Sequence, residues 1–208
     1  MVKNAKDVWK ELVSEIGVLY SVREAESIAY LLLEDIAGIS RTHILVNTPL
    51  EYDPEVLVAA IDKLRQNIPV QYIIGHTHFY GLDLRVGPGV LIPRPETEEL
   101  VALVIKENKL KAPAVLDIGT GSGCIAISLK TNIPGARVTG LDISPDALQI
   151  ARGKAQHHQV EVNIIESDIL KPQLFTEKFD LIVSNPPYVT LQEKALMKPN
   201  VVDHEPPE

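Results

Sequence analysis

A glycine-rich turn that follows a short apolar segment places the strongest constraint on what this chain can fold into. Residues 114–118, Ala-Val-Leu-Asp-Ile, have the composition of a buried strand, and residues 124–130 have the pattern of a helix. Between them the sequence reads Gly-Thr-Gly-Ser-Gly at residues 119–123. Glycine lets the backbone turn tightly and approach a ligand closely, and open parallel sheets bind ligands where strands end in such turns. We therefore predict a nucleotide-type binding site here, with a merely tight turn as the alternative.

Strands and helices alternate along the rest of the second half of the chain. Helices are expected near residues 95–110 and 145–157, and further strands at residues 137–142, 162–165 and 179–183. Such alternation is typical of a parallel sheet covered by helices on both faces. We predict an α/β domain over residues 94–208, in which four strands are visible.

The first part of the chain has a different organisation. Apolar residues repeat at the four-residue spacing of an amphipathic helix over residues 8–16, and Ser21 and Asp53 fit helix starts. Residues 1–68 are therefore predicted to form a small helical domain, which carries no chemistry of its own and docks a substrate or covers a site. Residues 69–93 are predicted to be a linker that contains a β-hairpin around a glycine-containing turn.

The charges around the glycine turn indicate which ligand it holds. The dinucleotide fingerprint places its third glycine one residue later than Gly123. Asp117 places a carboxylate at the mouth of the turn, where it would repel a diphosphate and attract a cationic ligand. S-adenosylmethionine (SAM) carries both an amino group and a sulfonium. Asp142, at the end of the second strand, is expected to bind both ribose hydroxyls. Asp168 is a candidate for the adenine amino group, beside an apolar wall at Ile169, and a helix cap or turn is its equally weighted alternative.

The fourth predicted strand, which is expected to end beside the first, runs into a rigid loop, Asn185-Pro186-Pro187-Tyr188. Proline has no N–H and a fixed φ, and the residue before a proline is extended. The loop therefore offers acceptors, the side-chain oxygen of Asn185 and the carbonyl of Pro186, with Tyr188 as a flat wall. A planar –NH2 group has two hydrogens and needs two acceptors. We predict that this loop holds an amide or nucleobase amino group for methyl transfer, and a purely structural Pro-Pro turn is the alternative.

These motifs resemble the PrmC/HemK family, the N5-glutamine methyltransferases of class 1 peptide release factors. The resemblance covers nearly the whole chain and includes residues 69–75 (PVQYIIG), residues 91–98 (LIPRPETE), the glycine turn and the Asn-Pro-Pro-Tyr loop. It implies a Rossmann-like class I SAM-dependent methyltransferase domain, with an incomplete sheet here, preceded by a small all-helical domain and a β-hairpin connector. It also implies the reaction, in which SAM methylates the glutamine of the Gly-Gly-Gln loop of a release factor and leaves S-adenosylhomocysteine.

The resemblance and the residues together give a set of candidate roles. Catalysis is expected from Asn185, Pro186 and Tyr188, and substrate binding from the same three with Pro187. Cofactor binding is expected from Asp117, Gly119, Thr120, Gly121, Ser122, Gly123, Asp142, Asp168, Ile169 and Asn185. Residues 94–98 would border the cofactor, although a plain helix start explains Pro95, Glu96 and Thr97 equally well.

The composition argues against several other classes of protein. A net charge of −8 argues against a chain that grips extended nucleic acid through phosphates. No apolar run approaches the roughly 20 residues of a membrane span. Cys124 is the only cysteine, so an intrachain disulfide cannot form. The two histidine clusters, at residues 76–78 and 157–158, have no carboxylates at a matching spacing to complete a metal site. We expect a cytoplasmic monomer without a metal ion.

Two alternative functions stay open. One is an adenine-N6 or other nucleic-acid amino methyltransferase, because that class shares the Asn-Pro-Pro-Tyr loop. The other is a truncated module that binds SAM or a release factor without turnover. Members of the family continue beyond residue 208, so we expect this chain to be a fragment or to end at a premature stop, with the edge of its fourth strand exposed.

Overall fold

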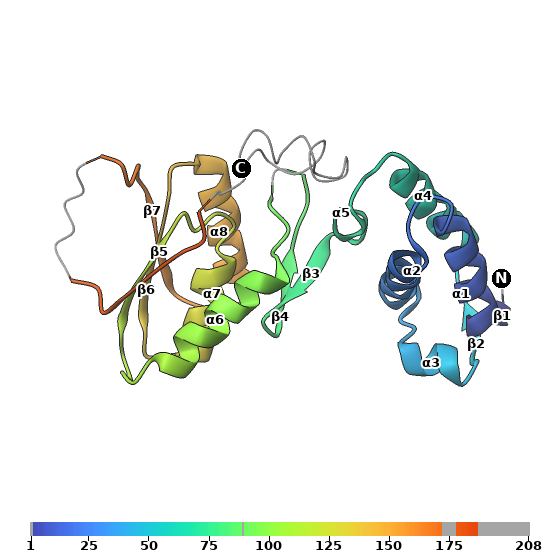
Figure 1. Ribbon diagram of the computed structural model, residues 1–208, viewed down its shortest axis with the longest axis horizontal. Helices are drawn as coiled ribbons and strands as arrows, with labels where there is room; N and C mark the ends of the chain where they lie inside the picture. The colour runs from blue at the N-terminus through green and yellow to red at the C-terminus, as the bar shows by residue number, and fades with distance from the viewer. Residues whose placement is uncertain (1, 89, 172–177, 187–208) are drawn as a thin grey trace. The chain divides into compact units, whose positions relative to one another are not determined.

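The computed structural model describes residues 2–88, 90–171 and 178–186 (Figure 1). The described residues divide into two compact units, one up to Gly75 and one from His76 onward. Among the helices of this part of the chain, none is both long and apolar enough to cross a membrane.

The first unit packs helices around one apolar core. The predicted apolar stripe of α1 (Ala5–Ile16) is buried at Val8, Leu12 and Ile16, where it meets α2 (Val22–Ala37). This confirms the amphipathic pattern read from the sequence. The remaining elements of the unit are β1 (Val2–Asn4), α3 (Arg41–Leu45), β2 (Pro49–Glu51), α4 (Pro54–Arg65) and α5 (Val70–Ile74), and β1 pairs with β2 in antiparallel fashion.

Two predicted helix starts in this unit are confirmed by their capping hydrogen bonds. The Ser21 hydroxyl accepts a hydrogen bond from the Glu24 amide at 3.4 Å, and the Asp53 carboxylate accepts one from the Glu55 amide at 2.9 Å. Each bond satisfies an amide that has no partner inside the helix. Local sequence signals therefore set where α2 and α4 begin.

The second unit is built on a four-stranded parallel sheet. The order of its strands across the sheet is β7-β6-β5-β8, so β8 lies beside β5 as predicted. Because the chain moves from β5 outward to β7 and then returns to the other side of β5, the direction of winding reverses between β5 and β8, and ligands bind at such a point. The elements are α6 (Pro95–Glu107), β5 (Ala114–Ile118), α7 (Cys124–Asn132), β6 (Arg137–Asp142), α8 (Pro145–His157), β7 (Val162–Glu166) and β8 (Leu181–Ser184).

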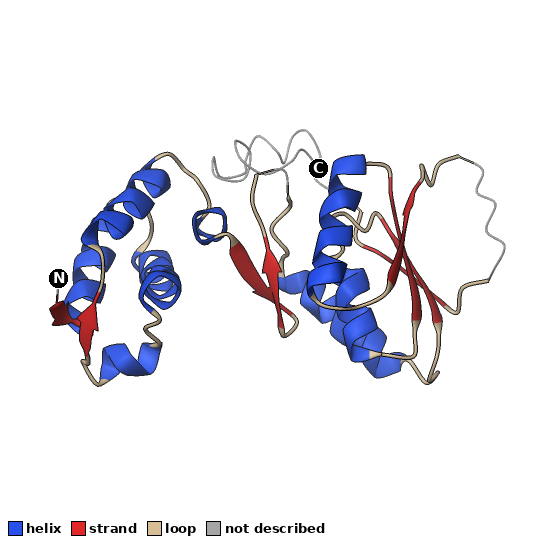
Figure 2. Ribbon diagram, turned by 180° about the vertical axis from the view of Figure 1, so that it is seen from behind, coloured by secondary structure: helices blue, strands red, loops and turns tan. Residues whose placement is uncertain are grey.

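The described helices α6, α7 and α8 lie together on one face of the sheet, so the expectation of helices on both faces is wrong for the described residues (Figures 1 and 2). The reason is topological. The steps from β5 to β6 and from β6 to β7 run in the same direction, and right-handed crossovers then place α7 and α8 on the same face. The connection from β7 back to β8 is the one that would cross the other face, and its residues 172–177 lie outside the described part of the chain.

A β-hairpin packs onto this helical layer. Strands β3 (His76–Phe79) and β4 (Leu82–Arg85) are joined through Tyr80 and Gly81, whose φ angles are +46° and +77°. Two positive φ angles in succession are typical of the tight turn whose twist matches a hairpin. Phe79 and Leu84 are buried with residues of α6, α7 and the sheet. Segment 69–93 is thus divided between the units, with α5 in the first and the hairpin in the second.

Candidate functional site

The predicted site residues gather at the carboxyl edge of the parallel sheet. The glycine turn follows β5, Asp142 ends β6, Asp168 comes two residues after β7, and Asn185 comes directly after β8. Since neighbouring parallel strands end at one edge, residues far apart in the sequence come together there. Pro187 and Tyr188, which were also predicted site residues, lie outside the described part of the chain.

The glycine turn is open on the side where a ligand would approach. Gly119 and Gly121 have φ angles of +69° and +52°, and a Cβ built on either would meet no heavy atom within 4 Å. Gly123 is different, because a Cβ there would lie 3.0 Å from the Ala151 Cβ and 3.2 Å from the Ile127 Cδ1. The first two glycines therefore form an open backbone cradle, and the third allows α7 to pack closely against α8.

Asp117 lies beneath the turn rather than at its mouth. Its side chain is fully buried, and its Oδ2 accepts a 2.6 Å hydrogen bond from the Thr120 hydroxyl. Burial raises the pKa of its carboxyl to about 6, while the Thr120 hydroxyl and the Ala126 amide oppose the rise. Its Oδ1 is buried and has no hydrogen-bond partner among the described residues. Asp117 is therefore placed to affect a ligand in the turn only through its charge and not by direct contact.

Gly140 makes room for the Thr120 side chain. A Cβ on Gly140, in β6, would lie 2.9 Å from the Thr120 Oγ1. The sequence analysis did not single out this glycine. A glycine inside a strand signals that another group approaches the backbone closely, and that signal could have found it.

Asp142 fastens β6 to the glycine turn. Its Oδ2 accepts a hydrogen bond from the Gly121 amide at 2.7 Å, and its Oδ1 accepts one from the Ser144 amide at 2.9 Å. Each carboxylate oxygen can accept a second hydrogen bond, so both keep capacity for a ligand. The position predicted for ribose binding therefore also holds the shape of the turn.

Asp168 forms a turn of its own. Its Oδ1 accepts a hydrogen bond from the Leu170 amide at 2.9 Å, and the Lys171 ammonium lies 3.6 Å from its Oδ2. A side-chain bond to the amide two residues later is the turn alternative that the sequence left open. Ile169 beside it is 42% exposed, and Ser122 in the glycine turn is half-buried. Adenine binding at Asp168 and Ile169 stays a prediction.

The Asn185 carboxamide is held from α6. Its Nδ2 donates a 3.1 Å hydrogen bond to the Thr97 hydroxyl, which lies in the first turn of α6 and is 7% exposed. Asn185 itself is exposed, and its Oδ1 has no donor among the described residues. The carboxamide is thus not packed into the interior, and its oxygen is free to accept. Sequence reasoning treated Thr97 as a border or helix-start residue and missed this contact.

A second hydroxyl ties the start of the loop to the glycine turn. The Ser184 Oγ donates a 2.8 Å hydrogen bond to the Ile118 carbonyl, which directly precedes Gly119. The bond joins the carboxyl ends of β8 and β5 across the pair at which the sheet winding reverses. Asn185 and the glycine cradle are therefore set side by side by backbone pairing as well as by this side chain.

The thiol of Cys124 is not available as a thiolate. Burial raises its pKa to about 12, in spite of its place at the start of α7 and the nearby Lys154 ammonium. Among the described residues, no group of three or more His, Cys, Asp or Glu side chains could hold a metal ion.

Known proteins match both parts of the chain. The family model described as PrmC N-terminal domain matches residues 10–75, and the model described as Methyltransferase small domain matches residues 97–202. A release factor glutamine methyltransferase of Flavobacterium psychrophilum is 41% identical over an alignment of 208 positions that covers 97% of this chain and 73% of that protein. One of Bacteroides thetaiotaomicron is 43% identical over an alignment of 192 positions that covers 90% of this chain and 69% of that protein.

These relatives are longer than the chain, which spans about seven tenths of their length. A solved structure, the tRNA (uracil-54, C5)-methyltransferase of Pyrococcus abyssi in complex with S-adenosyl-L-homocysteine, is 18% identical with a TM-score of 0.46. The match covers 58% of this chain and 30% of the tRNA methyltransferase.

Proposed function

This chain belongs to the release factor glutamine methyltransferase family, and from that premise we propose that it methylates the side-chain amide nitrogen of a release-factor glutamine, with SAM as the donor. The finer assignment is the N5 nitrogen of the glutamine in the Gly-Gly-Gln loop of class 1 release factors. The observation that carries the proposal is the Asn185 carboxamide, which is exposed and held by Thr97 at the sheet edge where the open glycine cradle lies.

The residues present at this edge fit SAM. The cradle at Gly119 and Gly121 leaves space where side chains would otherwise intrude. Asp142 keeps acceptor capacity for a ribose, and the buried Asp117 beneath the turn favours a cationic ligand. SAM supplies an electrophilic methyl group on a sulfonium when it is bound. We assign its binding to these residues together with Thr120, Ser122, Gly123, Asp168, Ile169 and Asn185.

Asn185 and Pro186 can compensate for the weak nucleophilicity of an amide nitrogen. An amide nitrogen is a weak nucleophile because its lone pair is delocalised into the carbonyl. The Asn185 Oδ1 and the Pro186 carbonyl can each accept one of the two amide hydrogens, which fixes the nitrogen and stabilises the positive charge that develops on it. Positioning and electrostatics of this kind supply much of a rate enhancement. Pro187 and Tyr188 are assigned to the same pocket.

Thr97 and Ser184 act as positioning residues. Thr97 takes the donor side of the Asn185 carboxamide and so directs the acceptor oxygen toward the substrate, while Ser184 holds the start of the loop to β5. Because Asn185 is exposed, the proton that the substrate nitrogen loses can pass to water. The substrate amide therefore needs no buried base at this position.

The wider biological setting stays a prediction. We propose that the helical first unit docks the release factor, and that the chain acts as a cytoplasmic monomer. The net charge of −8 supports a protein substrate over extended nucleic acid.

Mass spectrometry of a release factor tests the proposed function. After incubation with SAM and this chain, the peptide that contains Gly-Gly-Gln should carry one added methyl group on the glutamine. A release factor with that glutamine replaced by glutamate is the matched control and should stay unmodified, because it has no amide nitrogen. Methylation of adenine in DNA without methylation of the peptide would contradict the proposal. SAM binding without transfer to either substrate would identify a non-catalytic module.

A further inference from the structure

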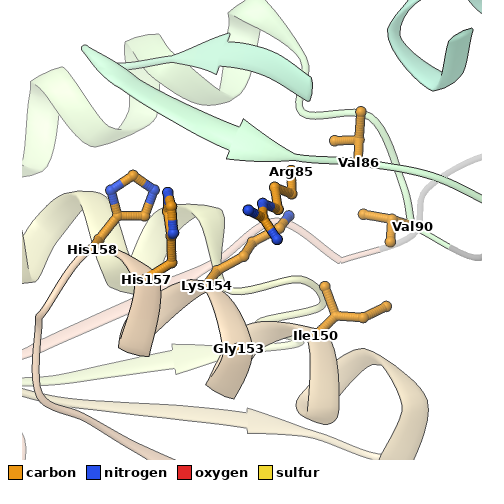
Figure 3. Close-up of a pocket in the computed structure, with 8 residues that line it drawn as sticks. All are labelled: Arg85, Val86, Val90, Ile150, Gly153, Lys154, His157 and His158. Carbon is orange, nitrogen blue, oxygen red and sulfur yellow. The ribbon is translucent and has the colours of Figure 1, made fainter. Parts of the chain in front are cut away.

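A separate cationic pocket lies between the hairpin and α8. It encloses about 300 Å³, and four of its lining residues carry basic side chains (Figure 3). None of the described residues assigned to SAM or to the glutamine substrate lines it. The lining residues are Arg85, Val86, Val90, Ile150, Gly153, Lys154, His157 and His158.

Lys154 is the feature of this pocket that most needs an explanation. The residue is only 4% exposed, and its Nζ makes no hydrogen bond with any residue that the structure describes. Burial lowers the pKa of its ammonium to about 8. Removing a charged group from water is unfavourable unless a partner of opposite charge replaces the water. No such partner is found among the described residues of the protein, and an anionic ligand could supply one.

Other positive or titratable groups surround the same space. Figure 3 shows Arg85 reaching from β4 toward the Lys154 side chain of α8. Within the described part of the chain, no carboxylate lines the pocket. Asp83, the acidic residue nearest to Arg85 in the sequence, pairs with His76. The Asp83 Oδ1 lies 2.7 Å from the His76 Nδ1. The backbone carbonyl of Asp83 lies 3.2 Å from the His158 Nε2, which fixes the orientation of that ring.

The opposite wall of the pocket is apolar. Val86, Val90 and Ile150 supply it, and Gly153 leaves the floor of α8 without a side chain. The volume of about 300 Å³ is at the lower end of small-molecule sites. A bare inorganic anion would neutralise the charges but leave the apolar wall without contacts. The geometry suits a ligand with an anionic head and a small apolar body.

We propose that the cationic pocket binds a small phosphate monoester, with the phosphate between Arg85 and Lys154 and the organic part against Val86, Val90 and Ile150. The arginine fork can bind two phosphate oxygens at once, and the lysine adds a point charge. A phosphate with its double charge suits this group of cations better than a single carboxylate does. The site does not depend on methyl transfer.

Calorimetric titration of the full chain tests the proposal. The probes are phenyl phosphate, inorganic phosphate and phenol. Phenyl phosphate should bind more tightly than inorganic phosphate, and phenol should not bind. Arg85→Gln and Lys154→Met should each weaken phenyl phosphate binding roughly tenfold, because each removes one charge-assisted contact. Arg152→Gln is the matched control, since Arg152 lies on the same helix but bonds to the Ile164 carbonyl outside the pocket.

Several results would overturn the proposal. These are the absence of binding at millimolar phenyl phosphate, an equal loss of binding in Arg152→Gln, and displacement of the probe by S-adenosylhomocysteine, which would place the probe in the SAM site. If Lys154→Met does not fold, Arg85→Gln decides, because Arg85 is exposed and its replacement leaves no buried gap. In the ¹⁵N-labelled chain, the Gly153 and His157 amide signals should shift with the probe, and unchanged signals would also contradict the assignment.

Discussion

Replacing Asp117 with asparagine should stabilise the second unit at neutral pH. The Asp117 carboxyl is fully buried, and burial raises its pKa from 3.8 to about 6. The interval of about two pH units corresponds to roughly 3 kcal/mol of unfolding free energy. Asparagine removes the buried charge and keeps an oxygen that can accept the Thr120 hydroxyl. We therefore expect a gain of up to about 3 kcal/mol for the second unit at pH 7.5.

The gain should depend on pH in a defined direction. Because the folded state holds the Asp117 proton more tightly than the unfolded state, the native chain loses stability as the pH rises from about 4 to about 6. Above that interval the full penalty is present, and below it the penalty is absent. The difference between Asp117→Asn and the native chain should therefore be largest above pH 6 and disappear near pH 4.

Urea unfolding at several pH values measures this effect. Hydrogen exchange of the β5 amides reports the second unit, whereas the fluorescence of Trp9, the single tryptophan, reports the first unit and serves as an internal control. The Trp9 transition should be the same in both proteins. An Asp117→Asn variant that is less stable than the native chain at pH 7.5, or a difference that does not change with pH, would refute the reasoning. The variant should also bind SAM more weakly, as expected when a buried charge is kept for function.

Three further substitutions test individual contacts. Thr97→Val should lower kcat roughly tenfold at unchanged SAM affinity, because it removes one orienting hydrogen bond from Asn185. Thr97→Ser keeps the hydroxyl and should restore kcat. Steady-state kinetics in which KM alone changed would contradict this role. Gly121→Ala should weaken SAM binding in calorimetry, because a side chain at φ +52° costs about 1 kcal/mol and enters the cradle. Gly153→Ala in α8, where a Cβ meets nothing within 4 Å, is the control. An equal loss of SAM affinity in this control would contradict the role assigned to the glycine cradle. Lys154→Met should stabilise the chain by roughly 3 kcal/mol in urea unfolding at pH 7, because burial lowers the pKa of this lysine from 10.5 to about 8. The gain in unfolding free energy should shrink between pH 8 and 10.5, where the lysine loses its charge. A gain that does not depend on pH would argue against a buried charge.

Features with a local cause could be predicted from the sequence. The starts of α2 and α4 follow from Ser21 and Asp53, because a cap needs only one side chain and an amide two or three residues away. The glycine turn follows from its place between a strand and a helix. The pairing of β8 with β5 was also predicted correctly, because few topologies are compatible with this order of strands.

Features that depend on distant residues could not be predicted. Thr97 contacts Asn185 across 88 positions, and nothing near either residue in the sequence indicates the other. Asp117 was expected at the mouth of the turn, but the packing of α7 over β5 buries it. Lys154 lies in a helix segment with polar neighbours, so its burial results from the hairpin that packs over α8. Tertiary packing decides such burial, and periodicity within one element does not reveal it.

The contact between Gly140 and Thr120 has an evolutionary consequence. A Cβ at position 140 would lie 2.9 Å from the Thr120 Oγ1 and 3.2 Å from its Cβ, so even alanine at position 120 would crowd it. The two positions should therefore covary. In aligned homologues a larger residue at position 140 should occur only where position 120 is glycine or where the turn has shifted away from β6. Gly140 is therefore a marker of an intact glycine cradle. It can be recognised in a sequence without reference to any catalytic residue.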